Sequence, residues 1–116
     1  MQTPRIDSYC FGAIVIDGHS YSHDVIIYPD RVDGGWWREE GHSVGPADLW
    51  EVLESRPDVL VIGQGRPGRM EVPDDTRGKV GEAGIELIVQ PTSEATATYN
   101  RLREVRRVVA ALHLTC

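Results

Sequence analysis

Residues 60–69, LVIGQGRPGR, carry the pattern G-x-G-x-x-G directly after an apolar run. In dinucleotide-binding proteins the third glycine of this pattern opens a helix, whose amide end meets the pyrophosphate. Here Pro67 interrupts that geometry, and a second proline, Pro73, follows after only RMEV. A P-loop is excluded because neither Lys-Ser nor Lys-Thr follows the glycines. The loop is therefore predicted to turn the chain, with Gly63 and Gly65 supplying unusual φ angles, and not to hold a nucleotide.

A small-molecule or anion crevice is the alternative interpretation of this loop. Ligands of open α/β sheets lie outside the carboxyl ends of parallel strands, where Gly63 to Gly68 and Gln90 to Thr92 are expected. Backbone amides beside glycines are open to a ligand, and Arg66 would attract an anion. His42 lies in a predicted loop and is the candidate acid or base of such a site.

The histidines and cysteines form no local metal site or catalytic pair. His19 and His23 share a face of a predicted hairpin but lie about 13 Å apart, too far for one metal. His113 and Cys116 are separated by an odd number of residues, which sends their side chains to opposite faces of a strand. We expect His113 to be a hydrogen-bonded core residue and Cys10 and Cys116 to be free thiols. The sequence predicts no catalytic residue, metal or cofactor, since no triad order, HExxH motif or carboxylate pair stands out.

The Trp36-Trp37 pair predicts a surface indole. In extended backbone the two side chains point to opposite sides, so one enters the core and the other remains near the surface. Trp is enriched where binding energy concentrates, which makes the outer indole a candidate partner-facing or pocket-lining group. Nearby aspartates form an acidic patch that equally serves solubility; they are Asp17, Asp24, Asp30 and Asp33.

Length and composition predict one domain, residues 1–116, because a chain of 116 residues with 41% hydrophobic content buries a real core. The net charge of −6 disfavours nucleic acid, whose affinity for proteins rests on Lys and Arg. No apolar run approaches the roughly 20 residues of a membrane-spanning helix. The segment MQTPRIDSYC lacks the features of a signal or transit peptide. We therefore expect a cytoplasmic protein that binds neither membranes nor nucleic acid.

The elements that must position these residues begin with a β-hairpin over residues 8–28. Asp17-Gly18 suits a type I′ turn, which fixes the register of the two strands. The predicted pairs are Ile16 with His19, Ile14 with Tyr21 and Gly12 with His23. A second turn is expected at Gly34-Gly35.

The second half of the chain alternates helices and strands. The expected elements are a helix from Pro46 that Pro57 stops, a buried strand at 59–62, a short helix at 74–83, a buried strand at 85–90, a helix capped by Thr92 or Ser93, and a strand at 107–114. This order is typical of βαβ units. The fold class is therefore α/β, with a mixed central sheet joined to an N-terminal hairpin.

Six segments resemble one family in the order in which they occur: FGAIVIDG, DVIIYPD, WWREEGH, PADLWE, VLVIGQG and YNRLREVRRVVAALHLTC. It is the family of small α/β proteins that includes mitochondrial complex I assembly factor 3 and the adipogenesis-associated domain protein. The resemblance implies a three-layer fold, with no established activity, cofactor or catalytic residue. It also adds positions to the candidate crevice, whose full set is Trp37, His42, Gly63, Gln64, Gly65, Arg66, Thr92, Tyr99, Asn100 and His113.

Two functions are thus expected. The first is a non-enzymatic domain that acts through contacts with a protein partner, as an assembly or accessory factor, by analogy with the family. The alternative is a small-molecule or anion-binding protein, or a weak enzyme, with its crevice near Gly63 to Arg66. Homodimer formation through the hairpin or an edge strand is allowed by the sequence.

Overall fold

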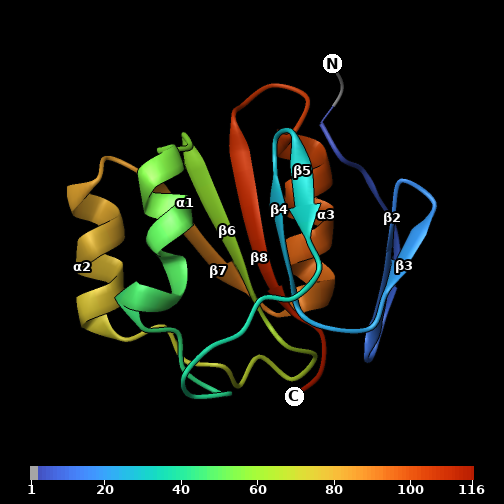
Figure 1. The fold of residues 1–116 in the computed structure, drawn as a ribbon, viewed down its shortest axis with the longest axis horizontal. Helices are drawn as coiled ribbons and strands as arrows, with labels where there is room; N and C mark the ends of the chain where they lie inside the picture. Colours follow the sequence, from blue (N-terminus) through green and yellow to red (C-terminus); the bar gives the residue numbers. More distant parts are fainter. Residues whose placement is uncertain (1–2) are drawn as a thin grey trace.

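The computed structural model describes residues 3–116, which form two sheets and the helices that cover them (Figure 1). The strands are β1 (Ile6–Cys10), β2 (Ala13–Ile16), β3 (His19–Tyr21), β4 (Val25–Tyr28), β5 (Arg31–Asp33), β6 (Val59–Gln64), β7 (Glu86–Gln90) and β8 (Val108–His113). The helices are the 3-10 turn η1 (Pro46–Leu49), α1 (Trp50–Ser55), α2 (Asp74–Glu82) and α3 (Thr92–Leu102).

The central sheet has the order β5-β4-β8-β6-β7. It is mixed, as predicted, because β6 runs parallel to both β7 and β8 whereas β4 runs antiparallel to β8. A smaller antiparallel sheet contains β1, β2 and β3. Figure 1 shows α1 and α2 together on one side of the molecule and α3 with the small sheet on the other.

Two hydrophobic clusters, one on each face of the central sheet, explain these three layers. Along β6, Leu60 and Ile62 enter the cluster that holds Val52 of α1 and Val80 of α2. The alternate residues of β6 enter the cluster that holds Tyr99 of α3 and Ile14, Ile16 and Ile6 of the small sheet. The continuous apolar run of β6 is therefore the pattern of a strand covered on both faces.

The predicted hairpin is confirmed at its turn and wrong at its ends. The pairs Ile14 with Tyr21 and Ile16 with His19 form, and Asp17 and Gly18 have φ angles of 49° and 79°. The pair Gly12 with His23 is absent, since β2 begins at Ala13 and the preceding β1 folds back onto it. After Tyr21 the chain leaves for the central sheet, because all four residues of β4 are buried and need cover on both faces.

The second half of the chain matches the prediction with two corrections. β7 was expected to be buried, but it forms an edge of the central sheet and its residues are only partly covered. Neither Thr92 nor Ser93 caps α3, whose N-cap is Pro91 and lacks a side-chain cap. The hydroxyl of Thr92 makes other hydrogen bonds, described below. Within residues 3–116, no helix is long and apolar enough to cross a membrane.

Candidate functional site

The backbone amides of the glycine loop are occupied by bonds within the protein. Gly65 N donates to Oγ1 of Thr92 at 2.8 Å, and Arg66 N donates to the carbonyl oxygen of Thr115 at 2.9 Å. Gly68 N donates to the carbonyl oxygen of Gly65 at 3.2 Å. These three donors are therefore used to turn the chain and are not presented to a ligand.

Close packing explains the glycines at positions 63 and 65. A Cβ atom on Gly63 would lie 2.8 Å from Oγ1 of Thr92, and one on Gly65 would lie 2.9 Å from Cδ2 of His113. The Thr92 hydroxyl also donates to the carbonyl oxygen of His113 at 2.5 Å. Thr92 thus links the glycine loop to the end of β8, which is why it does not cap its own helix.

Three charged or ionisable side chains form a cluster beside this loop, which we call the Asp24 cluster: Asp24, Arg38 and His113. Nη2 of Arg38 and Nδ1 of His113 each lie 2.8 Å from Oδ2 of Asp24. Oδ1 of Asp24 accepts the backbone N–H of Leu114 at 2.8 Å. Arg38 and His113 are buried, with side-chain exposures of 5% and 8%. Nδ1 of His113 also lies 3.1 Å from Nη2 of Arg38, so this nitrogen contacts both charged side chains of the cluster.

The hydrogen bonds determine the charge state of Asp24. Burial alone would raise the pKa of this carboxyl group, but the bonds from His113, the Leu114 amide and Arg38 together lower it to about 2. The Asp24 carboxylate is therefore ionised at neutral pH and balances the buried Arg38 guanidinium. Each of the two side chains that contact Asp24 has one buried nitrogen without a hydrogen-bond partner among the described residues, Nη1 of Arg38 and Nε2 of His113.

The predicted crevice positions lie in three separate places. His42, Gly65 and Thr92 gather around His113, with the ring centroids of His42 and His113 6.1 Å apart in an edge-on arrangement. Gln64 and Arg66 lie on the same loop; the Gln64 amide donates to the Met70 carbonyl oxygen at 2.9 Å.

Tyr99 and Asn100 do not join that group, because both hold the N-terminal segment against α3. The Tyr99 hydroxyl donates to the carbonyl oxygen of Pro4 at 2.6 Å, and its burial raises its pKa. Asn100 accepts a hydrogen bond from Ile6 N at 3.0 Å and donates one to Ile6 O at 2.8 Å. The polar groups of these two side chains therefore bind the backbone of the N-terminal segment.

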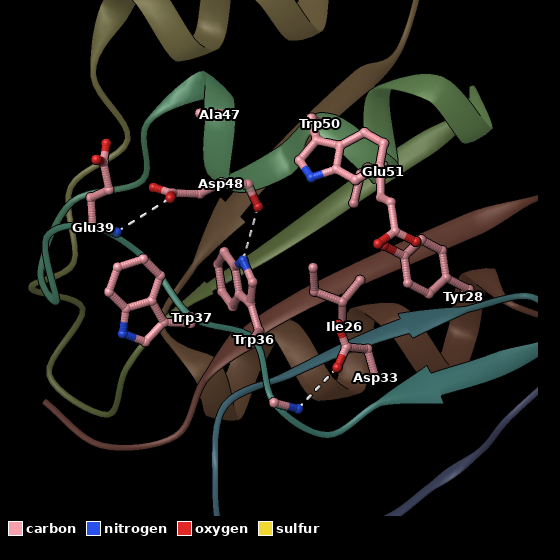
Figure 2. A pocket seen from close by; sticks show the side chains of 12 residues that line it. Ile26, Tyr28, Asp33, Trp36, Trp37, Glu39, Ala47, Asp48, Trp50 and Glu51 are labelled. Atoms are coloured by element: carbon pink, nitrogen blue, oxygen red, sulfur yellow. Dashed lines mark hydrogen bonds between the residues drawn. The ribbon is translucent and has the colours of Figure 1, made fainter.

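Trp37 lies apart from the glycine loop, on a groove of about 360 Å³ that we call the tryptophan groove (Figure 2). As predicted, the Trp36-Trp37 pair divides, with Trp36 7% exposed and Trp37 76% exposed. Trp50, at the start of α1, is 59% exposed and lines the same groove. In the view of Figure 2, Trp36 lies between the two exposed indoles.

The Asp24 cluster fixes the segment that displays Trp37. Trp36 N donates to the carbonyl oxygen of Asp24 at 2.9 Å, and the Arg38 guanidinium stacks 4.5 Å from the centre of the Trp36 ring. Indole Nε1 of Trp36 donates to the carbonyl oxygen of Asp48 at 3.0 Å (Figure 2). Trp37 is therefore exposed between two anchored residues, Trp36 and Arg38.

Sequence reasoning missed three of these residues. Asp24 was assigned to a surface patch. Arg38 was not predicted as a site residue, because its partners Asp24 and His113 are 14 and 75 residues away in the chain. Trp50 had a local signal that was not used: it falls outside the apolar helical face of Leu49, Val52 and Leu53. Within residues 3–116, no three His, Cys, Asp or Glu side chains gather as a metal site.

The fold and these features define a small three-layer α/β protein with a buried ionic cluster at its strand ends and an exposed tryptophan groove. The chain belongs to the DUF498/DUF598 family, described as proteins of unknown function, whose model matches residues 6–113.

Solved structures share this fold. A conserved hypothetical protein from Pyrococcus horikoshii OT3 is 30% identical with a TM-score of 0.88, and the match covers 97% of this chain and 99% of that one. A protein from Bartonella henselae described as an outer membrane protein is 27% identical with a TM-score of 0.83, over 99% and 98% of the two chains. A Bordetella pertussis protein described as an Mth938-like domain, 22% identical with a TM-score of 0.63 over 96% and 85%, shows the fold alone.

Proposed function

We propose that this protein works through protein contacts and that the tryptophan groove is its binding surface. The proposal rests on one observation, the presence of two exposed indoles, Trp37 and Trp50, on a single groove. The likeness to the family that includes mitochondrial complex I assembly factor 3 adds an analogy, and we propose an assembly or accessory role without catalysis. Fold-level analogy is the weaker of these two supports.

Exposed aromatic surface carries the physical argument. Among the described residues, the exposed large hydrophobic side chains are Phe11, Trp37, Trp50 and Val105. Two of these four line one groove, whereas Phe11 and Val105 are not among its lining residues. Clustered exposed apolar surface marks interaction sites, and Trp is enriched among the residues that dominate binding energy.

The alternative, a ligand crevice near Gly63 to Arg66, has less geometric support. An anion there would need backbone amides, and those of Gly65, Arg66 and Gly68 already donate within the protein. A thermal-shift screen against anions and metabolites tests this alternative directly. A ligand at 100 times its dissociation constant would add about 2.7 kcal/mol to the free energy of unfolding.

The proposed function is tested by quantitative affinity capture from the cells that naturally express the protein. The bait is the full chain, compared with Trp37→Ala, Trp50→Ala and the control Val105→Ala, whose residue is 75% exposed outside the groove. We expect each tryptophan variant to capture about tenfold less of the same partner, or less still, and the control to capture as much as the unchanged chain. The pair is then reconstituted from purified components. A partner captured equally by all four baits contradicts the proposal.

A further inference from the structure

We infer that the partner presents a basic segment, with an Arg or Lys side chain stacked on the indoles of the tryptophan groove. The inference rests on the proposed function and adds the chemical class of the partner. It follows from the charges around the groove, from a second acidic hollow beside it, and from the way this protein already packs its own arginines.

The charged residues that line the groove are all acidic, and one of them, Glu51, is paired at 3.0 Å with Arg31 at its border. Its lining includes four carboxylates, those of Asp33, Glu39, Asp48 and Glu51, and no Lys, Arg or His among the residues described. Two of these are held in place by backbone amides: Gly35 N donates to Asp33 at 3.0 Å (Figure 2), and Gly45 N donates to Asp48 at 2.8 Å. A cation entering the groove therefore meets carboxylates and indoles together.

A second hollow extends this acidic surface. It has a volume of about 370 Å³ and shares Glu39 and Asp48 with the tryptophan groove. It adds the carboxylates of Glu40 and Asp75 to its lining. Because the two hollows share a wall, an extended segment can place one cation on the indoles and further cations beside Glu40 and Asp75.

The protein already stacks guanidinium groups on aromatic rings at the borders of this region. Arg31 lies 4.0 Å from the centre of the Tyr28 ring, and Arg38 lies 4.5 Å from the centre of the Trp36 ring. Within residues 3–116, no cation of the chain stacks on Trp37 or Trp50. Trp is the strongest of the aromatic partners for a cation, so these two indoles offer the contact that their neighbours already make.

Other occupants fit these observations less well. A purely apolar segment would cover carboxylates without balancing their charge, which costs desolvation energy. An acidic segment or a nucleic acid would be repelled by this lining and by the net charge of −6. A basic segment of a protein supplies both an aliphatic stem for the indoles and a charge for the carboxylates.

The test uses a fluorescein-labelled peptide of alternating Gly and Arg and a matched peptide with citrulline, the neutral isostere, at every Arg. Fluorescence anisotropy with the full chain measures the two dissociation constants. We expect the Arg peptide to bind about tenfold or more tightly than the citrulline peptide and to weaken as salt is raised. Trp37→Ala should weaken its binding several-fold, as should the double variant Glu40→Gln, Asp75→Asn.

Controls separate the outcomes. Val105→Ala should leave binding unchanged, and circular dichroism should show that Trp37→Ala is folded, since its side chain is 76% exposed. Three results would each refute the inference that the partner presents a basic segment. They are equal binding of both peptides, no binding of either peptide, and binding of free arginine amide as tight as that of the Arg peptide. If capture of a partner still depends on Trp37 and Trp50 in that event, the proposed function stands and only its partner class is wrong.

Discussion

Gly65 is the residue of the glycine loop that tolerates substitution least. It has a φ of +87°, and a Cβ there would lie 2.9 Å from the His113 ring and closer still to the carbonyl oxygen of Thr115. We expect Gly65→Ala to lower the free energy of unfolding by about 3 kcal/mol, through backbone strain and the collision with rigid backbone. Urea denaturation followed by circular dichroism measures this change.

The matched control for Gly65 lies in α2. Gly78 has an ordinary helical φ and open space around a Cβ atom. Gly78→Ala should therefore raise the free energy of unfolding by about 0.5–1 kcal/mol, because Gly costs backbone entropy in a helix. A Gly65→Ala variant as stable as Gly78→Ala would refute the packing explanation of the loop.

Asp24 gives the protein a pH dependence at acidic pH. Its pKa falls from an ordinary 3.8 to about 2 in the folded state, so its stabilisation is complete above about 3.8 and is lost as the pH falls through 2. This shift corresponds to about 2 kcal/mol. The variant Asp24→Asn lacks this titration and leaves the Arg38 guanidinium buried without a carboxylate, which costs about 3 kcal/mol at neutral pH.

The measurement for Asp24 is the difference in unfolding free energy between wild type and Asp24→Asn from pH 6 to pH 2. Other carboxylates titrate in both proteins and cancel in this difference. We expect the gap to narrow by about 2 kcal/mol toward pH 2. A gap that stays constant over this range would show that Asp24 is not the titrating group.

At the scale of residues, the sequence predicts features that neighbouring residues determine. It does not predict contacts between residues that only the fold brings together. The division of Trp36 from Trp37 and the burial of His113 follow from neighbours in the chain, and both are confirmed. The partners of His113 come from positions 24 and 38, which only the folded sheet brings together. Thr92 has a side chain suited to a cap, but bonds to Gly65 and His113 replace that role.

At the scale of elements, the side chain of Asn100 hydrogen-bonds helix α3 to strand β1. The Asn100 amide exchanges two hydrogen bonds with the backbone of Ile6, 94 residues away. We expect Asn100→Ala to cost about 2 kcal/mol, because it leaves the N–H and C=O of Ile6 without these partners. Hydrogen exchange measured by NMR should show faster exchange at Ile6 N while β6 is unaffected.

The exposed neighbour Arg101, on the same helix, supplies the control for Asn100. Arg101→Ala removes no bond to β1 and should change the free energy of unfolding by less than about 0.5 kcal/mol. If Asn100→Ala and Arg101→Ala behave alike, the contact between α3 and β1 is not held by Asn100.

Element prediction succeeds where one pattern decides the outcome. Asp17-Gly18 fixes its turn, and the apolar run of β6 identifies a strand covered on both faces. It fails where the tertiary arrangement decides. β4 continues the hairpin in sequence but joins the central sheet, and β7 has an apolar pattern much like that of β6 yet lies at an edge. No local signal distinguishes these cases.

At the scale of the whole molecule, the three layers give separate roles to the two faces of the central sheet. The face of α1 carries the tryptophan groove and its carboxylates, whereas the face of α3 holds the small sheet through Asn100 and Tyr99. The family resemblance predicted the layers, but the groove could not be predicted, because its walls come from three separate segments of the chain.

The last strand of the chain, β8, lies at the middle of the central sheet, between β4 and β6. Within this sheet, the earlier strands β4 and β5 are connected to the later strands β6 and β7 only through β8. During synthesis on the ribosome, the two halves must therefore wait until Val108–His113 has emerged from the exit tunnel. Until then, β4 and β6 each expose an unpaired edge, and this is when the nascent chain most needs protection from aggregation.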